Sequence, residues 1–470
     1  MSERKKIIKA TRMLKKLFAK HCFLGFLLLL AMDSTALYAA KPASNAKFTL
    51  TEAHRQKYVF KHPGLMLGRV ELDLIKSEVN NTDATPSESV RLRKLSWEEM
   101  MKTKAILYPK DEKLRLLSDL DYPPHAREQL VADGGVSENF STDSWAAYCH
   151  ALQWYVKGDH RNADKAIGIL NAWAGTLRKV SSASVYKGRQ EQLAISWITQ
   201  RLCEAAEILR YSHSGWKKED IRKFETMLTG VLLPIINHQC PENGNWEAST
   251  INALLAMGVF CNDEATFNLG IDFFHGTGNA ALEKYVFPSG QSAETLRDFG
   301  HAQMGIADLV DACEIAWHQG VDLYGELPDP QSGLPRLAKA IEYIATIENG
   351  NEVTGINNWG AYGEKGKEVR IKAVDGKNWA AGAENGFSKM IQPVYEVPWN
   401  HYANRMGFGA KMPNVQELLN SQNIWWLGST PGKAYRPEPF RENGQFGWGT
   451  LTHSNLSKPE KGRGNHKLSR

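Results

Sequence analysis

The sequence predicts a mainly α-helical protein whose helical hairpins close into an (α/α) toroid or incomplete barrel. Apolar residues recur at helical spacing between residues 143 and 348, and breaks such as KGDHRN and SHSGW divide this stretch into segments. Pairs of segments take about 40–50 residues, which is typical of stacked helical hairpins. Hairpins that each bury one face must pack on their neighbours, in an open solenoid or in a closed ring.

The expected helices follow one another in pairs. In the first, Trp145, Cys149 and Leu152 are spaced by four and three residues and lie on one helical face. The expected ranges are 143–157 with 162–178, 190–211 with 217–236, 246–260 with 264–275, and 292–319 with 334–348. After residue 349 the sequence is rich in Gly and Asn and has little periodicity, which predicts long loops or a small irregular subdomain.

Residues 1–40 have the order of segments that is typical of a secretory signal peptide. A stretch rich in Lys and Arg precedes the apolar run CFLGFLLLLAM, and small residues follow in DSTALYAA. The run is about ten residues long, whereas a bilayer-spanning helix needs about 20. We therefore expect a periplasmic or secreted protein with no membrane contact after signal removal; an uncleaved anchor is the competing interpretation.

The rest of the chain divides by composition. Residues 41–92 are expected to form an N-terminal arm, 93–348 the (α/α) toroid with the catalytic site, and 349–456 a loop-rich C-terminal part that completes the cleft. The tail 457–470 is basic and poor in apolar residues, which predicts a flexible end.

Charge and cysteine content narrow the possible functions. Residues 1–40 hold eight of the 57 Lys and Arg but only two of the 52 Asp and Glu, so the rest of the chain is nearly neutral. This balance gives no indication of a nucleic-acid partner. The cysteines beyond residue 40 are far apart and include no CxxC pair, so buried free thiols are expected. One disulfide, such as Cys240 with Cys261, stays open as an alternative.

Two stretches carry the chemistry. In CPENGNWEAST (240–250), Asn243 and Asn245 lie in a turn and Trp246 begins a helix, so backbone N–H groups and amides are available to an anion. The alternative is that these residues only cap the helix.

The second stretch is GQSAETLRDFGHAQMG (290–305). Glu294, Arg297, Asp298 and His301 are spaced by three and four residues, which predicts one helical face that lines a cleft for an acidic sugar. Arg297 can bind a carboxylate through two hydrogen bonds, and His301 can transfer a proton near neutral pH, with Asp298 orienting its ring. The alternative is a helix surface with ordinary ion pairs.

Several stretches together resemble the alginate-lyase-like superfamily of polysaccharide lyases. They are KHPGLMLG near the start, NGNWEAS in the middle, and above all GQSAETLRDFGHAQMGIADLVDACEIAWHQGVDLYG at 290–325, and the similarity covers most of residues 60–350. The resemblance implies a helical (α/α) toroid that cleaves uronic-acid polysaccharides of the alginate or glucuronan type by β-elimination. It implies no metal and no cofactor, and an acidic polysaccharide or oligosaccharide as partner.

The resemblance also implies roles for individual residues. The C5 hydrogen of a uronate is α to a carboxylate, and a base can remove it only after that negative charge is neutralised. Asn245 and Arg297 match the carboxylate-binding positions, and His301 is the first choice for the base or for a shared acid and base. The superfamily's His after the motif Asn is Trp246 here, however, and its Tyr seven residues after the Arg is Met304.

Other residues are therefore candidates for the missing pair and for sugar contacts. Each of them has a role in the core or in a turn as its alternative. The candidate acids and bases are His238, His401, Tyr402 and Tyr186, and the expected substrate contacts also include Asn243, Glu294, Trp246 and Trp399.

Two other functions stay open at this stage. An inverting glycoside hydrolase would need two carboxyl groups about 6.5–9.5 Å apart, for which Glu247, Glu294 and Asp298 are available. A catalytically inactive periplasmic glycan-binding protein would account for Trp246 and Met304. A metallohydrolase lacks support because no HExxH motif is present. The sequence does not decide which uronate polymer is the substrate, whether cutting is endo or exo, or the oligomeric state.

Overall fold

A computed structural model of the chain describes most of the region beyond the predicted leader. Its described ranges are 57–103, 116–132, 138–183, 190–359, 364–374, 387–388, 394–421 and 448–454. The chain divides into the units Met1–Thr51 and Glu52–Arg470, and all described residues belong to the second. The predicted signal peptide and tail lie outside these ranges. Within them, no helix combines the length and the apolar character that crossing a membrane would require.

The predicted helical hairpins are confirmed. The first is α4 (Glu138–Lys157) with α5 (His160–Thr176), and the third is α9 (Gly244–Cys261) with α10 (Glu264–His275). In the second, α6 (Gln190–Arg210) is followed by α7 (Lys218–Met227), a π-helical turn at Leu228–Leu232, and α8 (Leu233–Ile236). The fourth is α12 (Phe299–His318) with α13 (Arg336–Glu348), and the short α11 (Leu282–Tyr285) precedes it.

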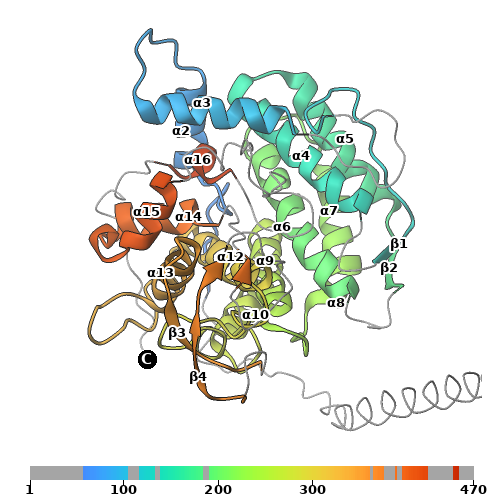
Figure 1. The fold of residues 1–470 in the computed structure, drawn as a ribbon. Helices are drawn as coiled ribbons and strands as arrows, with labels where there is room; N and C mark the ends of the chain where they lie inside the picture. Colours follow the sequence, from blue (N-terminus) through green and yellow to red (C-terminus); the bar gives the residue numbers. More distant parts are fainter. Residues whose placement is uncertain are drawn as a thin grey trace, which may run out of the picture. The chain divides into compact units, whose positions relative to one another are not determined.

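Contacts between helices form a closed circuit, which confirms an (α/α) barrel of helical hairpins. Helices α4, α6, α9 and α12 contact one another in that order, and α5, α10 and α13 pack on α4, α9 and α12 (Figure 1). The circuit continues from α13 through short C-terminal helices to α2, which packs on α4. These further elements are α15 (Pro413–Ser421), α14 (Glu396–Trp399), α16 (Gly449–Thr452) and α2 (Arg69–Val79).

The region expected as an N-terminal arm contains regular structure. Besides α2, it holds the start of α3 (Glu88–Met101), which packs on α2 and α16. The predicted boundary between residues 92 and 93 therefore lies inside a helix. Ser87 is the N-cap of that helix, and its side chain accepts a hydrogen bond from the backbone N–H of Val90.

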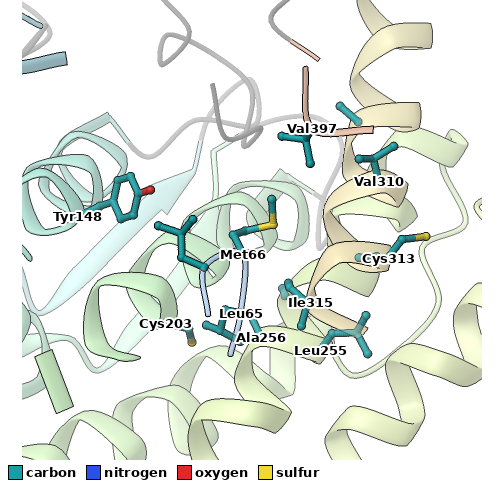
Figure 2. Close-up of a cluster of buried hydrophobic side chains, with 14 of the residues drawn as sticks. Leu65, Met66, Tyr148, Cys203, Leu255, Ala256, Val310, Cys313, Ile315 and Val397 are labelled. Carbon is teal, nitrogen blue, oxygen red and sulfur yellow. The ribbon is translucent and has the colours of Figure 1, made fainter. Parts of the chain in front are cut away.

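The KHPGLMLG stretch inserts into the core of the barrel. Leu65 and Met66 are buried among side chains of α6, α9 and α12 (Figure 2). Two buried carboxylates of α6 hold the backbone of the stretch: Glu204 accepts from Met66 N at 2.9 Å and from Leu67 N at 3.1 Å, and Glu207 accepts from Gly64 N at 3.2 Å. Irregular backbone inside a core needs such partners, since its own N–H groups are otherwise unpaired.

Short strands of the described residues form three two-stranded sheets. Strand β1 (Gln129–Ala132) pairs in parallel with β2 (Lys179–Ser182), and β5 (Ala373–Val374) in parallel with β6 (Phe387–Ser388). Strand β3 (Val353–Ile356) pairs antiparallel with β4 (Glu368–Ile371), with Val353 opposite Ile371. Strand β3 contacts α13, so the chain that was expected to be irregular includes an ordered hairpin next to the barrel (Figure 1).

The cysteines of the described region are free thiols. Cys149, Cys203, Cys240 and Cys313 are buried, and Cys261 is half-buried. The prediction of buried free thiols is confirmed, and the alternative disulfide between Cys240 and Cys261 is not formed.

Candidate active site

The 290–305 stretch is a loop followed by a helix, so the prediction of one continuous helical face was wrong. Helix α12 begins at Phe299 because Asp298 is its N-cap: Asp298 Oδ1 accepts the backbone N–H of His301 at 2.8 Å. A residue that caps a helix has extended backbone, which excludes helix on its N-terminal side. Glu294 and Arg297 therefore lie in the preceding loop, and His301 lies in the first turn of α12.

Glu294 is the centre of the polar cluster at this loop. Its side chain is almost fully buried, and its two oxygens accept hydrogen bonds from three different segments. Oε2 accepts from the backbone N–H of Asn245 at 2.9 Å and from the Tyr285 hydroxyl at 3.0 Å, and Oε1 accepts from Arg297 Nη1 at 2.8 Å. The carboxylate thus ties the loop to the N-terminus of α9.

The side-chain amide of Asn245 also faces this carboxylate. With its nitrogen turned toward Glu294, the orientation that satisfies both groups, the nitrogen lies 3.1 Å from Oε2 and 3.0 Å from Oε1. Asn245 and Arg297, which the sequence places far apart, therefore meet on one group, the Glu294 carboxylate. Asn245 is buried, however, so its amide positions Glu294 in this structure, and a direct contact with substrate stays a prediction.

Arg297 brings positive charge to the surface of the cluster. Its side chain is 27% exposed, and its Nε lies 3.9 Å from Asp298 Oδ2. Glu294 accepts from only one terminal nitrogen of the guanidinium, whose five N–H groups give it further donors for a ligand. The buried carboxylate fixes the direction of the guanidinium and offsets part of its charge.

Asp298 also binds the ring of His301. His301 Nδ1 lies 2.7 Å from Asp298 Oδ2, and the imidazole is 24% exposed. An acidic partner at Nδ1 favours the tautomer that carries its proton there, which makes Nε2 the basic nitrogen. One buried carboxylate therefore fixes both the start of α12 and the orientation of the imidazole.

Burial shifts the protonation of the groups beneath the surface. It raises the pKa of Glu294 above the usual 4.5, while Arg297 and the Asn245 N–H act in the opposite direction. Burial, together with the adjacent Glu294 carboxylate, raises the pKa of Tyr285 well above its ordinary 10.0. The Tyr285 hydroxyl therefore keeps its proton and acts as a donor to Glu294.

Comparison with known sequences identifies the protein family. The alginate lyase family model matches residues 80–353, which is more than half of the chain and includes every residue of the cluster described above. The chain belongs to the alginate lyase family. It is therefore a polysaccharide lyase. No curated protein matches its sequence.

Solved structures with a similar arrangement include alginate lyases. An alginate lyase from Bacteroides ovatus is 14% identical, with a TM-score of 0.44 over 61% of this chain and 84% of that one. Alginate lyase A1-III from Sphingomonas species A1 is 10% identical, with a TM-score of 0.45 over 64% and 82% of the two chains. Heparinase III is 15% identical, with a TM-score of 0.33 over 63% and 44%.

The residues that replace the expected His and Tyr form an apolar patch in this lyase. Trp246 packs against Leu193, Trp197 and Met304, and Met304 Sδ lies 3.3 Å from the side-chain amide of Asn245. Trp246 stays partly exposed beside the buried Met304. The side chains of this patch offer no acid or base.

The carboxyl groups considered for a hydrolase are engaged in structure. Glu247 is buried and accepts from the backbone N–H of Ala280 at 2.7 Å, while Glu294 and Asp298 have the partners given above. Within the described ranges, no three His, Cys, Asp or Glu side chains gather as a set that could hold a metal ion.

Two predicted residues near α9 have different surroundings. Asn243 is the N-cap of α9 by its backbone, and its side chain makes no capping hydrogen bond. It is half-buried, two residues before Asn245. His238 lies between α8 and α9, is exposed, and its carbonyl accepts from Gln192 Nε2 at 2.9 Å. His238 belongs to a separate stretch of surface chain, so a role as the base stays a prediction.

His401 and Tyr402 are core residues, which corrects their assignment to the site. Both are buried on a π-helical turn at Asn400–Arg405; Tyr402 donates to the carbonyl of Tyr324 at 3.2 Å, and the His401 ring stacks on Tyr324 with centroids 3.7 Å apart. The same turn binds Glu314, thirteen residues after His301 and hence about 20 Å farther along α12. The polar residues of PWNHYANR suggested a surface segment, whereas Asn400, His401 and Tyr402 are buried in the structure.

The remaining predicted residues stay without support as substrate contacts. Trp399 ends α14 and packs, partly buried, against the main core. Tyr186 lies outside the described residues.

Trp359, which was not predicted from the sequence, lies between β3 and β4 and contacts the loop of the cluster. Its indole Nε1 donates to the carbonyl of Ala293 at 2.6 Å, and its ring centroid lies 5.8 Å from Arg297 Cζ. The available signal was a Trp within the Gly- and Asn-rich NNWGAYG, in the stretch expected to complete the cleft.

Proposed function

We propose that this polysaccharide lyase cleaves a uronic-acid polysaccharide, of the alginate or glucuronan type, by metal-independent β-elimination. The observation that carries the proposal is the Asp298–His301 pair next to the partly exposed guanidinium of Arg297. A cation for the sugar carboxylate and an oriented imidazole are the two groups that the reaction needs. In line with the leader sequence, we place the reaction in the periplasm or outside the cell.

Arg297 supplies the first requirement. A guanidinium paired with the substrate carboxylate withdraws its negative charge, so electrons from the broken C5–H bond can spread onto the carboxylate oxygens. Such preorganised electrostatic stabilisation of developing charge is typically worth about 3 kcal/mol for one donor. Glu294 holds the guanidinium in place, and Asn245 and Tyr285 hold Glu294.

His301 supplies the second requirement. Its Nε2 takes the C5 proton, the electron pair forms the C4–C5 double bond, and the C4–O4 bond breaks. The departing O4 takes a proton, which His301 can return when it acts as a shared acid and base. The products are a new reducing-end chain and a chain with an unsaturated uronate at its end.

The test is turnover of a panel of polyuronates, measured by the ultraviolet absorbance of the unsaturated product. Arg297→Ala and His301→Ala are expected to lower kcat/KM by at least about 100-fold each while folding normally. The matched controls are Arg210→Ala, whose guanidinium pairs with Glu225 at 2.8 Å and is similarly exposed, and His275→Ala, whose imidazole pairs with Glu326 at 2.6 Å. The controls should retain wild-type turnover. Full activity of Arg297→Ala, or product without ultraviolet absorbance, would contradict the proposal.

A further inference from the structure

Trp359 is a large aromatic residue whose side chain lies exposed at the surface. Its side chain is 41% exposed, and among the large apolar side chains of the described region it is the one aromatic residue with such exposure. Its only polar atom already donates to Ala293, so the indole gains no hydrogen bond from its position at the surface. An exposed aromatic face of this kind favours a ligand with an apolar face of its own.

The segment that carries Trp359 is held firmly. The buried side chain of Gln291 accepts from Ile356 N at 2.7 Å and donates to Ile356 O at 2.8 Å. Asn358 Nδ2 also donates to the carbonyl of Ala293. These bonds dock the end of β3 on the loop before α12, so the indole is preorganised and a ligand would lose little entropy in ordering it.

A cation lies beside the indole. Arg297 Cζ is 5.8 Å from the ring centroid, and His301 follows Arg297 by four residues, in the first turn of α12. A uronic-acid ring has a face of C–H groups that stacks on an aromatic ring, and a carboxylate that pairs with a guanidinium. Neutral sugars have the first feature alone, and simple carboxylates have the second alone.

We propose that Trp359 and Arg297 form one binding subsite, in which a uronic-acid ring stacks on the indole while its carboxylate pairs with the guanidinium. This inference rests on the proposed function and adds its substrate contact. The subsite selects acidic pyranoses over neutral ones, and the indole contributes to binding rather than to bond cleavage. Loss of Trp359 therefore raises KM and leaves kcat nearly unchanged.

The experiment measures binding apart from turnover. In a His301→Ala background, the affinity for an alginate- or glucuronan-derived tetrasaccharide is measured by calorimetry, with a neutral tetrasaccharide as comparison. Trp359→Ala should weaken uronate binding by about tenfold, which corresponds to about 1.4 kcal/mol and lies within the range of an aromatic contact of this kind. Trp359→Phe should recover most of it. Val131→Ala, which shortens an exposed apolar side chain on β1, should bind like the parent protein.

The outcomes separate this inference from the proposed function. If wild type forms unsaturated product while Trp359→Ala keeps the parent affinity and KM, the subsite is wrong and the function stands. If binding falls in Trp359→Ala but no variant or wild type forms unsaturated product, the function is wrong and the subsite stands. The subsite is also wrong if the protein binds no uronate at all. It is wrong as well if Trp359→Ala changes the oligomeric size but not the affinity, which would assign Trp359 to contacts between copies of the chain.

Discussion

At the scale of single residues, Asp298 connects the fold to the proposed chemistry. One oxygen caps α12 and the other binds His301 Nδ1. In Asp298→Asn the cap survives, since Asn is an equally good N-cap, but an amide no longer compels the proton to stay on Nδ1. We expect kcat to fall by at least about 100-fold, with little change in KM or thermal stability. Steady-state kinetics and a melting curve check this; an unchanged kcat would show that the imidazole needs no carboxylate partner.

Single residues also show how far sequence reasoning reaches. Arg297, His301 and Asn245 were predicted together because their motifs resemble those of one family, and the structure joins the first and last on Glu294. His401 was assigned to the site wrongly because the amino-acid sequence alone does not show that its side chain is buried. Trp359 was missed because it contacts Ala293, 66 residues earlier, through a hairpin that no periodicity predicts.

At the scale of elements, helix existence was predictable and one functionally important boundary was not. Apolar spacing gave every hairpin between α4 and α13, because each of these helices buries a face. The start of α12 was placed too early since buried Leu296 continues the apolar pattern into the loop. The start of α12 is set by the hydrogen bond from His301 N–H to the Asp298 side chain. A side-chain acceptor of this kind competes with the backbone carbonyls that would otherwise continue the helix toward its N-terminal side.

The anchor of the KHPGLMLG stretch gives a prediction at the same scale. Burial raises the pKa of Glu204 on α6 from 4.5 to about 8, although the N–H groups of Met66 and Leu67 act against this shift. A carboxyl group with a raised pKa in the folded state stabilises the fold at low pH, and this contribution is lost as pH rises through the folded value. Glu204→Gln cannot ionise. The Tm of the variant minus that of wild type should therefore be larger at about pH 8 than at about pH 5. Melting curves at both pH values test this, and a constant difference in Tm would contradict it.

At the scale of the whole barrel, a buried ionic cluster joins segments from distant parts of the sequence. Arg405, on the π-helical turn, donates to Glu314 of α12 at 2.7 and 2.9 Å and lies 3.4 Å from Glu71 of α2. His318 Nε2 lies 3.2 Å from the same Glu71 carboxylate. All four side chains are at most 5% exposed. The cluster links α2, α12 and the C-terminal part, which are the elements that complete the circuit of helices. No local sequence pattern could predict it, because Arg405 lies 91 residues from Glu314 and 334 residues from Glu71 in the sequence.

This cluster predicts how the barrel responds to substitution and to acid. Arg405→Met removes the shared guanidinium and leaves Glu71 and Glu314 buried together, which should cost about 3–5 kcal/mol at neutral pH and lower Tm accordingly. The control is Arg91→Ala, which breaks an exposed pair with Glu88 on α3 and should leave Tm nearly unchanged. Arg405 and the neighbouring histidines depress the pKa of Glu314 from 4.5 to about 2, so the pairing stabilises wild type fully above the unfolded value and is lost as pH falls below it. The Tm difference between Arg405→Met and wild type should therefore shrink on acidification from about pH 7 to pH 4. Protonation relieves the repulsion between the buried carboxyl groups in the variant, and wild type begins to lose the contribution of Glu314 once pH falls below the unfolded pKa of 4.5. A difference that stays constant over this range would contradict an ionic origin of the stabilisation by Arg405.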